Sequence, residues 1–193
     1  GAPPTVSLAS VLVATTCLVL VTAMALRNDP DAMLRSASST LFPVLFVGLT
    51  LGTLVGLRAG AGEVGEDALL LLLVCVISSD AAAYYFGSAF GKRRMAPILS
   101  PKKTWEGAAS GVLASVAGAL VAHFWIYPWL TLGHAIGLGA VLACAGILGD
   151  LAESAVKRAA GAKDSSMLLP GHGGFLDRVD SLLFAGPALY VYY

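Results

Sequence analysis

The sequence has little charge for its length. Only 12% of its 193 residues are charged, whereas 57% are hydrophobic and the mean hydropathy is +0.80. A soluble domain of this size needs about twice that share of charged residues to cover its surface. The low charge therefore excludes a soluble globular domain and indicates an integral membrane protein.

The chain also lacks an excess of charge of either sign. Twelve basic and twelve acidic residues give a formal net charge of zero. Tails and patches that bind nucleic acid carry a strong excess of one sign. The balance therefore argues against a nucleic-acid partner and against a polyionic tail.

Cysteine is scarce, and the three cysteines, Cys17, Cys75 and Cys144, each lie within an apolar stretch. No pair lies in a polar loop and no C-x-x-C motif occurs, so neither a disulfide framework nor a zinc site is supported. The period-two alternation that a transmembrane barrel requires is also lacking. The predicted fold class is therefore all-α.

Six apolar stretches alternate with polar segments, and a helix needs about 20 such residues to cross a bilayer. They are Thr5–Leu26, Leu41–Leu57, Ala68–Phe90, Ala108–Leu130, Leu132–Leu151 and Ser181–Tyr193. We predict a polytopic bundle of about six transmembrane helices that forms a single domain over residues 1–193. The fourth stretch contains Gly111, Ser115 and Gly118, which predict close helix packing.

Both ends of the chain look incomplete. The last apolar stretch has only thirteen residues, too few to cross a bilayer, so we expect the final helix to be truncated. The opening Gly-Ala-Pro-Pro without an initiator Met suggests a trimmed N-terminus. The first stretch has no basic segment before it, so we expect a true span rather than a signal peptide.

Eleven of the twelve basic residues fall on one side of the predicted membrane, and only Arg58 falls on the other. Basic loops face the cytoplasm, so we expect the N-terminus of this chain to lie outside. Two polar segments, 91–107 and 150–180, are long enough to hold a site. Both then face the cytosol.

Two pairs of carboxylates with the same spacing occur in the second of these segments. Asp150 and Glu153 are three residues apart, as are Asp177 and Asp180, so each pair shares a helix face. Carboxylate oxygens suit hard cations, and acids near a membrane tend to mark function. The four are candidate metal ligands. The alternative is that they are solvated helix-end charges neutralised by nearby basic residues.

A glycine-rich turn lies between the two acid pairs and contains Gly171, His172, Gly173 and Gly174. Such a turn lets backbone amides approach an anion closely, although it can also be a plain tight turn. Four flanking basic residues supply charge that pairs with phosphate: Lys157, Arg158, Lys163 and Arg178. Together these features predict a phosphoryl- or nucleotidyl-transfer site. The candidate catalytic residues are Asp150, Lys157, Lys163, Asp177 and Asp180.

The other cytosolic segment contains hydroxyls, lysines, a tryptophan and an acid within seven residues. This composition suggests a second anion-contacting loop, whereas Lys92–Arg94 are typical of an ordinary cytoplasmic loop. The candidate substrate-binding residues here are Ser100, Lys103, Thr104, Trp105 and Glu106. Asp80 lies about twelve residues inside the third apolar stretch, and an acid there marks a functional site unless a neighbouring helix pairs it with a base.

At these residues the sequence resembles the phosphatidate cytidylyltransferase (CDP-diacylglycerol synthase) family. The resemblance runs from Ser154 to Asp180 and includes Lys157-Arg158, Lys163-Asp164, Pro170–Gly174 and Asp177-Arg178 at fixed spacing. The stretch from Asp80 to Gly107 is similar to the family's middle segment, including the run from Ser100 to Gly107. Together these cover the C-terminal two-thirds of the chain. The first two apolar stretches match only as generic membrane helices.

The resemblance implies a bacterial-type enzyme of the inner (plasma) membrane, with its active site facing the cytoplasm. It would convert CTP and phosphatidic acid to CDP-diacylglycerol and pyrophosphate by direct attack of the lipid phosphate. It also implies dependence on Mg²⁺ with a second cation, for which K⁺ is a candidate, and assembly as a homodimer. Asp150, Glu153, Asp177 and Asp180 would hold the cations. The implied substrate contacts are the Ser100–Glu106 loop with Asp80, Arg158, His172, Gly173, Gly174 and Arg178.

Two other functions stay open. A CTP-dependent lipid kinase, of the polyprenol or phytol kinase type, would use similar acids and lysines but would release CDP instead of pyrophosphate. A cation or substrate transporter would account for Asp80 and for the glycine-interrupted helices. It would not account for the glycine turn with its flanking lysines.

Overall fold

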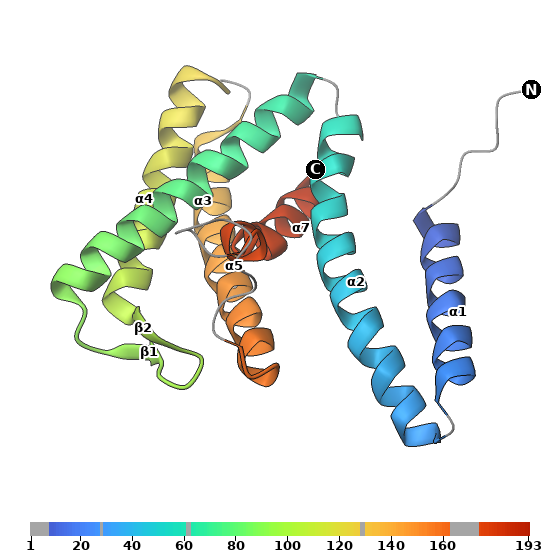
Figure 1. Cartoon of the computed structure of the whole chain (residues 1–193). Helices are drawn as coiled ribbons and strands as arrows, with labels where there is room; N and C mark the ends of the chain where they lie inside the picture. Colours follow the sequence, from blue (N-terminus) through green and yellow to red (C-terminus); the bar gives the residue numbers. More distant parts are fainter. Residues whose placement is uncertain (1–7, 28, 61–62, 128–129, 163–173) are drawn as a thin grey trace, which may run out of the picture. The chain divides into compact units, whose positions relative to one another are not determined.

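The structure is a computed structural model that describes residues 8–27, 29–60, 63–127, 130–162 and 174–193. Within these ranges the chain is almost entirely helical and has one short antiparallel β-hairpin (Figure 1). The helices are α1 (Leu8–Leu26), α2 (Pro30–Gly60), α3 (Glu63–Phe90), α4 (Trp105–Trp125), α5 (Leu132–Ala159), α6 (Leu176–Val179) and α7 (Leu182–Tyr192). The strands are β1 (Arg94–Ala96) and β2 (Ser100–Thr104).

Four of these helices are long and apolar enough to cross a membrane. The spanning segments are Pro30–Ala59, Gly65–Phe90, Trp105–Trp125 and Leu132–Ala159. Val11–Leu26 and Leu182–Tyr192 are apolar but shorter. The protein is therefore a polytopic helical membrane protein, as predicted. The described residues contain four full-length candidate spans instead of about six.

Two helices extend beyond the apolar stretches that predicted them. α2 begins at Pro30, where Asp29 caps it by accepting a hydrogen bond of 2.9 Å from the backbone nitrogen of Ala32. Proline is favoured at the first helical position because its fixed φ suits the helix. α5 continues past Leu151 to Ala159. A helix can thus carry charged residues beyond the part of it that is apolar.

The chain divides into two compact units, residues 1–49 and residues 50–193, with the boundary inside α2. The first unit contains α1. The second contains α3, the hairpin, α4, α5, α6 and α7, and the candidate site lies wholly within it. The single catalytic domain over residues 1–193 stays a prediction.

Small residues bring α3, α4 and α5 into close contact, which confirms the prediction made from the fourth apolar stretch. A Cβ added at Gly111 would lie only 2.9 Å from the Oγ of Ser79. Ser115 is fully buried and donates a hydrogen bond of 2.7 Å to the carbonyl oxygen of Gly139. A Cβ at Gly139 would lie 2.7 Å from the Cα of Val116. The three helix backbones therefore form a tightly packed frame.

The apolar core of the second unit lies between these helices and α7. Its fully buried members include Leu72 on α3, Ala119 on α4, Leu142 on α5 and Leu189 on α7. Lipid tails are as apolar as leucine, so between helices that cross a membrane these side chains stabilise the fold through close van der Waals packing. This core fixes the helix ends that carry the polar residues described below.

The segment between α3 and α4 folds as the β1–β2 hairpin, whereas the predicted fold class was all-α. Arg94 pairs with Thr104 across the two strands. Thr104 also caps α4, because its side chain accepts a hydrogen bond of 3.2 Å from the nitrogen of Gly107. A Cβ at Gly91, just after α3, would clash with the side chain of Thr104. The base of the hairpin is therefore packed tightly between α3 and α4.

The chain returns to α5 after α6, and a glycine permits the close approach. A Cβ at Gly149 would lie 2.5 Å from the carbonyl oxygen of Asp180. The hairpin lies beside the C-terminal part of α5, at the same end of this unit (Figure 1). The two polar segments that were predicted to share one side of the membrane therefore meet.

Candidate active site

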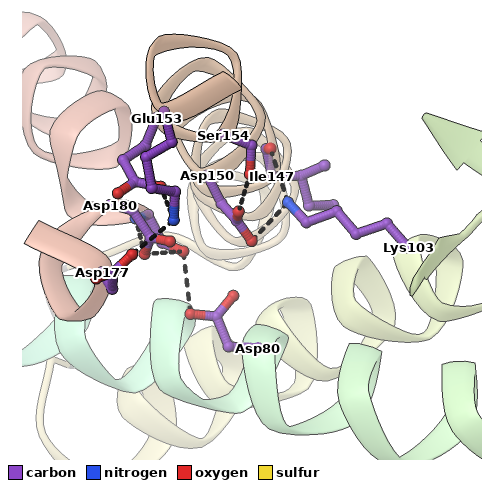
Figure 2. Close-up of polar contacts among 10 residues, drawn as sticks. Asp80, Lys103, Ile147, Asp150, Glu153, Ser154, Asp177 and Asp180 are labelled. Atoms are coloured by element: carbon purple, nitrogen blue, oxygen red, sulfur yellow. Dashed lines mark hydrogen bonds and ion pairs between the residues drawn. The ribbon is translucent and has the colours of Figure 1, made fainter. Parts of the chain in front are cut away.

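A cavity of about 610 Å³ lies where α3, the hairpin, α4, α5 and the α6–α7 connection meet. This volume is in the usual range for small-molecule sites, about 300–1,000 Å³. The charged residues that line it are Asp80, Arg94, Lys102, Lys103, Asp150, Asp177 and Asp180. Side chains from distant parts of the sequence thus face one space (Figure 2).

Ser181 links two of the acids. Its Oγ donates a hydrogen bond of 3.1 Å to the Oδ2 of Asp80, which lies 101 positions earlier in the sequence. The backbone nitrogen of Ser181 donates to the Oδ1 of Asp180 at 2.7 Å. Ser181 is buried, with 4% of its surface exposed. It therefore holds the acid on α3 and the acid before α7 at the same wall of the cavity.

Lys103 connects the hairpin to α5. Its Nζ lies 2.6 Å from the Oδ2 of Asp150 and 3.4 Å from the carbonyl oxygen of Ile147. Ser154 approaches the other oxygen of Asp150, with its Oγ 3.4 Å from Oδ1. Asp150 is therefore bonded on both sides, and the hairpin lysine reaches the acidic wall (Figure 2).

Lys157 lies between two other carboxylates. Its Nζ is 2.5 Å from the Oε2 of Glu153 and 2.6 Å from the Oδ1 of Asp177. The Glu153 side chain is fully buried. Gly174 donates its backbone N–H to the other oxygen of Asp177 at 2.8 Å. The two predicted acid pairs are therefore joined through a lysine.

Negative charge exceeds positive charge among the side chains joined by these contacts. Burial, followed by the charge of Asp150, raises the pKa of Asp180 to about 7. The charges of Asp80 and Glu153 act in the same direction, whereas the hydrogen bond from the backbone of Ser181 opposes the shift. A group of carboxylates that disfavour one another's ionisation is suited to binding a cation.

The donors at this wall are oxygen atoms, which suit Mg²⁺ better than a soft metal ion. Within the described ranges, no three acidic, His or Cys side chains converge closely enough to hold an ion alone. Mg²⁺ keeps several waters and often binds through one or two carboxylates together with substrate phosphates. Asp150, Asp177 and Asp180 line the cavity and fit that mode, whereas Glu153 is buried against Lys157.

The residues of the predicted anion-contacting loop divide between the cavity and its support. Those that line the cavity are Ser100, Lys102, Lys103 and Thr104. Trp105 is largely exposed. Glu106 accepts hydrogen bonds from the backbone nitrogens of Lys92 and Arg93, at 3.1 and 3.2 Å. Its carboxylate therefore fixes the start of the hairpin.

Three residues of the predicted site, Lys163, His172 and Gly173, lie outside the described residues. Arg158 is exposed and donates a hydrogen bond of 3.0 Å to the carbonyl oxygen of Ala162. Arg178 is exposed on α6. Neither arginine is among the described residues that line the cavity.

Two residues that line the cavity, Ser181 and Arg94, were not predicted as site residues. Arg94 donates a hydrogen bond to the carbonyl oxygen of Pro101 across the hairpin. Arg94 is typical of a cytoplasmic loop, and only the strand pairing places it at the site. For Ser181 the one local signal was its position next to Asp180.

The fold and this site define a polytopic membrane protein with a charged cavity whose lysines and acids suit a phosphorylated substrate. The sequence pattern of the Cytidylyltransferase family matches residues 2–193. The chain belongs to the Cytidylyltransferase family, which confirms the resemblance noted from its motifs.

Individual relatives agree with this assignment. The chain is 35% identical over 178 residues to the uncharacterized protein YnbB of Escherichia coli (strain K12), covering 91% of this chain and 59% of that protein. It is 47% identical over 116 residues to the phosphatidate cytidylyltransferase of Brucella abortus, covering 56% and 40% of the two chains. For the phosphatidate cytidylyltransferase of Haemophilus influenzae the values are 43% over 114 residues, covering 57% and 40%. The chain thus spans 40% to 59% of the length of these curated relatives.

Proposed function

We propose that this protein transfers CMP from CTP to phosphatidic acid, giving CDP-diacylglycerol and pyrophosphate. The observation that carries the proposal is the meeting of Asp80, Lys103, Asp150, Asp177 and Asp180 at one cavity. Membership of the Cytidylyltransferase family supports nucleotidyl transfer. The names of the Brucella and Haemophilus relatives supply the candidate substrates.

The reaction needs no nucleophile from the protein. A phosphate oxygen of phosphatidic acid attacks the α-phosphorus of CTP, and the bond from that phosphorus to the oxygen shared with the β-phosphorus breaks. Pyrophosphate leaves with the electron pair. The lipid phosphate is already anionic near pH 7, so the protein's task is to align the two phosphates and to stabilise charge.

The cationic residues of the hairpin perform part of that task. Lys103, Lys102 and Arg94 line one wall of the cavity and would orient the triphosphate and stabilise the leaving pyrophosphate. Charges held in place by the fold need no reorganisation as the negative charge of the transition state develops. Ser100 lines the same wall and adds a hydroxyl donor.

Mg²⁺, when bound, would supply Lewis-acid stabilisation of the phosphate charge. Asp150, Asp177 and Asp180 are the residues that would hold it. A second cation, for which K⁺ is a candidate, is part of the proposal and rests on the family resemblance alone.

The proposed reaction takes place at the cytoplasmic face of a bacterial-type inner (plasma) membrane. This location is favoured because the cavity lies at the end of the helices that carries the basic polar segments. CTP would reach it from the cytosol and phosphatidic acid from the bilayer. Assembly as a homodimer rests on the family resemblance alone.

The purified protein in detergent tests the proposal when it is supplied with CTP and phosphatidic acid, with and without Mg²⁺. We expect release of pyrophosphate that requires both substrates and the metal ion. Asp180→Asn should lower the rate strongly, while Asp31→Asn, an exposed acid at the start of α2, serves as the matched control. Release of CDP with a lipid alcohol would indicate a kinase, and ion flux in liposomes without consumption of CTP would indicate a transporter.

A further inference from the structure

Lys157 is the cation most deeply enclosed by acids in the described part of the site. Its side chain is 16% exposed and lies between Glu153, on the preceding turn of α5, and Asp177, at the start of α6. The two nitrogen–oxygen distances are 2.5 and 2.6 Å. Both of these contacts are therefore short ion pairs.

Glu153 holds Lys157 in this position through their ion pair. The Glu153 side chain has 0% exposure, and a buried carboxylate is very unfavourable without a partner of opposite charge. The residues are spaced i, i+4 on α5, so the pair forms on one helix face without any change of backbone. Lys157 could not turn to a substrate phosphate without leaving Glu153 buried and uncompensated.

Asp177 is the one member of this group that faces the cavity. It lines the cavity, whereas neither Glu153 nor Lys157 is among the described lining residues. Its Oδ1 contacts Lys157 and its Oδ2 accepts a hydrogen bond from the nitrogen of Gly174. Both oxygens are held from behind, so the orientation of this carboxylate is fixed before any ligand arrives.

We propose that Lys157 and Glu153 form a positioning pair that fixes the Asp177 carboxylate at the cavity wall, and that Lys157 does not itself contact substrate phosphates. This inference deepens the proposed function and rests on it. It assigns both residues a role different from the one that the motif suggested, which was phosphate contact for Lys157 and metal coordination for Glu153. Residues that orient a metal ligand from behind commonly change metal affinity about 10- to 100-fold when they are replaced.

Mn²⁺ binding to the nucleotide-free protein, measured by electron paramagnetic resonance, separates the two roles without any need for turnover. The variants are Lys157→Met, Glu153→Gln and the double variant. Because Lys157→Met alone leaves a buried charge, the double variant, which neutralises both members, protects the test against loss of folding. Lys92→Met removes an exposed lysine elsewhere on the cytosolic side and is the matched control.

The two roles of Lys157 predict changes in Mn²⁺ affinity of opposite sign. Removing a positive charge near a cation site should tighten Mn²⁺ binding by simple electrostatics, whereas loss of positioning should weaken it. We expect Lys157→Met and the double variant to bind Mn²⁺ about 10-fold or more weakly, with Lys92→Met unchanged. Equal or tighter Mn²⁺ binding, with a raised KM for CTP, would overturn the inference and make Lys157 a phosphate ligand.

Measuring both Mn²⁺ binding and formation of CDP-diacylglycerol distinguishes a failure of this inference from a failure of the proposed function. Mn²⁺ binding that weakens as expected, in a protein that forms no CDP-diacylglycerol, would support the positioning pair and refute the proposed reaction. Formation of CDP-diacylglycerol together with equal Mn²⁺ binding in all variants would support the proposed reaction and refute the positioning pair. Absence of Mn²⁺ binding to the unmodified protein would also overturn the inference, because the pair would then have no metal ligand to position.

Discussion

Replacing Gly149 by alanine tests whether the contact between α5 and the α6–α7 connection assembles the site. The added Cβ would lie 2.5 Å from the carbonyl oxygen of Asp180 and 3.4 Å from both the nitrogen and the Cβ of Phe184. A close carbon–oxygen contact is about 3.3 Å, so the backbone at Asp180 must move by about 0.8 Å. The obstacle is backbone, which cannot turn aside as a flexible side chain would.

The expected effects follow from that displacement. Overpacking of this kind destabilises a protein by about 1–3 kcal/mol, which lowers the Tm by about 2–4 °C for each kcal/mol in a chain of this size. A displacement near 1 Å at a reacting centre can lower the rate about 100-fold. The assays are thermal unfolding in detergent and CTP-dependent formation of labelled lipid.

Gly146→Ala is the matched control, because it adds the same methyl group one turn earlier on the same helix. Its Cβ would lie 3.5 Å from the Cβ of Ser181, an ordinary contact. Alanine is favoured over glycine inside a helix by about 1 kcal/mol, so this variant should be as stable as the unmodified protein or more so. If Gly149→Ala matched Gly146→Ala in Tm and in activity, the reasoning about the close approach would be refuted.

Three further predictions concern single contacts. Lys103→Met removes the ammonium group that lies 2.6 Å from Asp150. Turnover of CTP should fall roughly 100-fold, with little change in Tm, because partly exposed ion pairs stabilise a fold by only about 0–1 kcal/mol. An unchanged rate would exclude Lys103 from the site. Ser181→Ala removes the hydrogen bond to Asp80 and should cost about 1 kcal/mol of stability, measured as Tm. The pKa of Asp180 rises from 3.8 to about 7 on folding, so the folded state binds more protons than the unfolded state between those pH values. The Tm of the metal-free protein should therefore fall as pH rises from 4 to 7. The Tm of Asp180→Asn should depend less on pH, and an equal dependence in the two proteins would contradict this cause.

The sequence predicted those features that depend on local pattern. The apolar stretches correctly predicted α3, α4 and α5. A segment that crosses a bilayer must satisfy its backbone hydrogen bonds internally, so a long apolar stretch folds as a helix. The spacing of Asp150 with Glu153 and of Asp177 with Asp180 predicted that each pair would act together. The structure shows that three of these four residues line one cavity.

Features that depend on distant contacts could not be read from the chain. The hydrogen bond of Ser181 to Asp80 joins residues 101 positions apart, and no local pattern encodes it. The hairpin was missed because Ser100–Thr104 has neither alternating polarity nor many β-branched residues. Neutralisation of the acids by nearby basic residues was the alternative that the sequence left open, but the burial of Glu153 against Lys157 was not predicted. A lysine in a phosphate-binding motif looks the same whether it faces a ligand or a buried acid.

The position of a radioactive label in the lipid product tests the central claim most directly. The purified protein is given phosphatidic acid and Mg²⁺ with CTP that carries phosphorus label at either the α or the γ position. Transfer of CMP predicts label in the lipid fraction from α-labelled CTP alone, with the γ label recovered as pyrophosphate. Label in lipid from γ-labelled CTP, or no label in lipid from either substrate, would contradict the account.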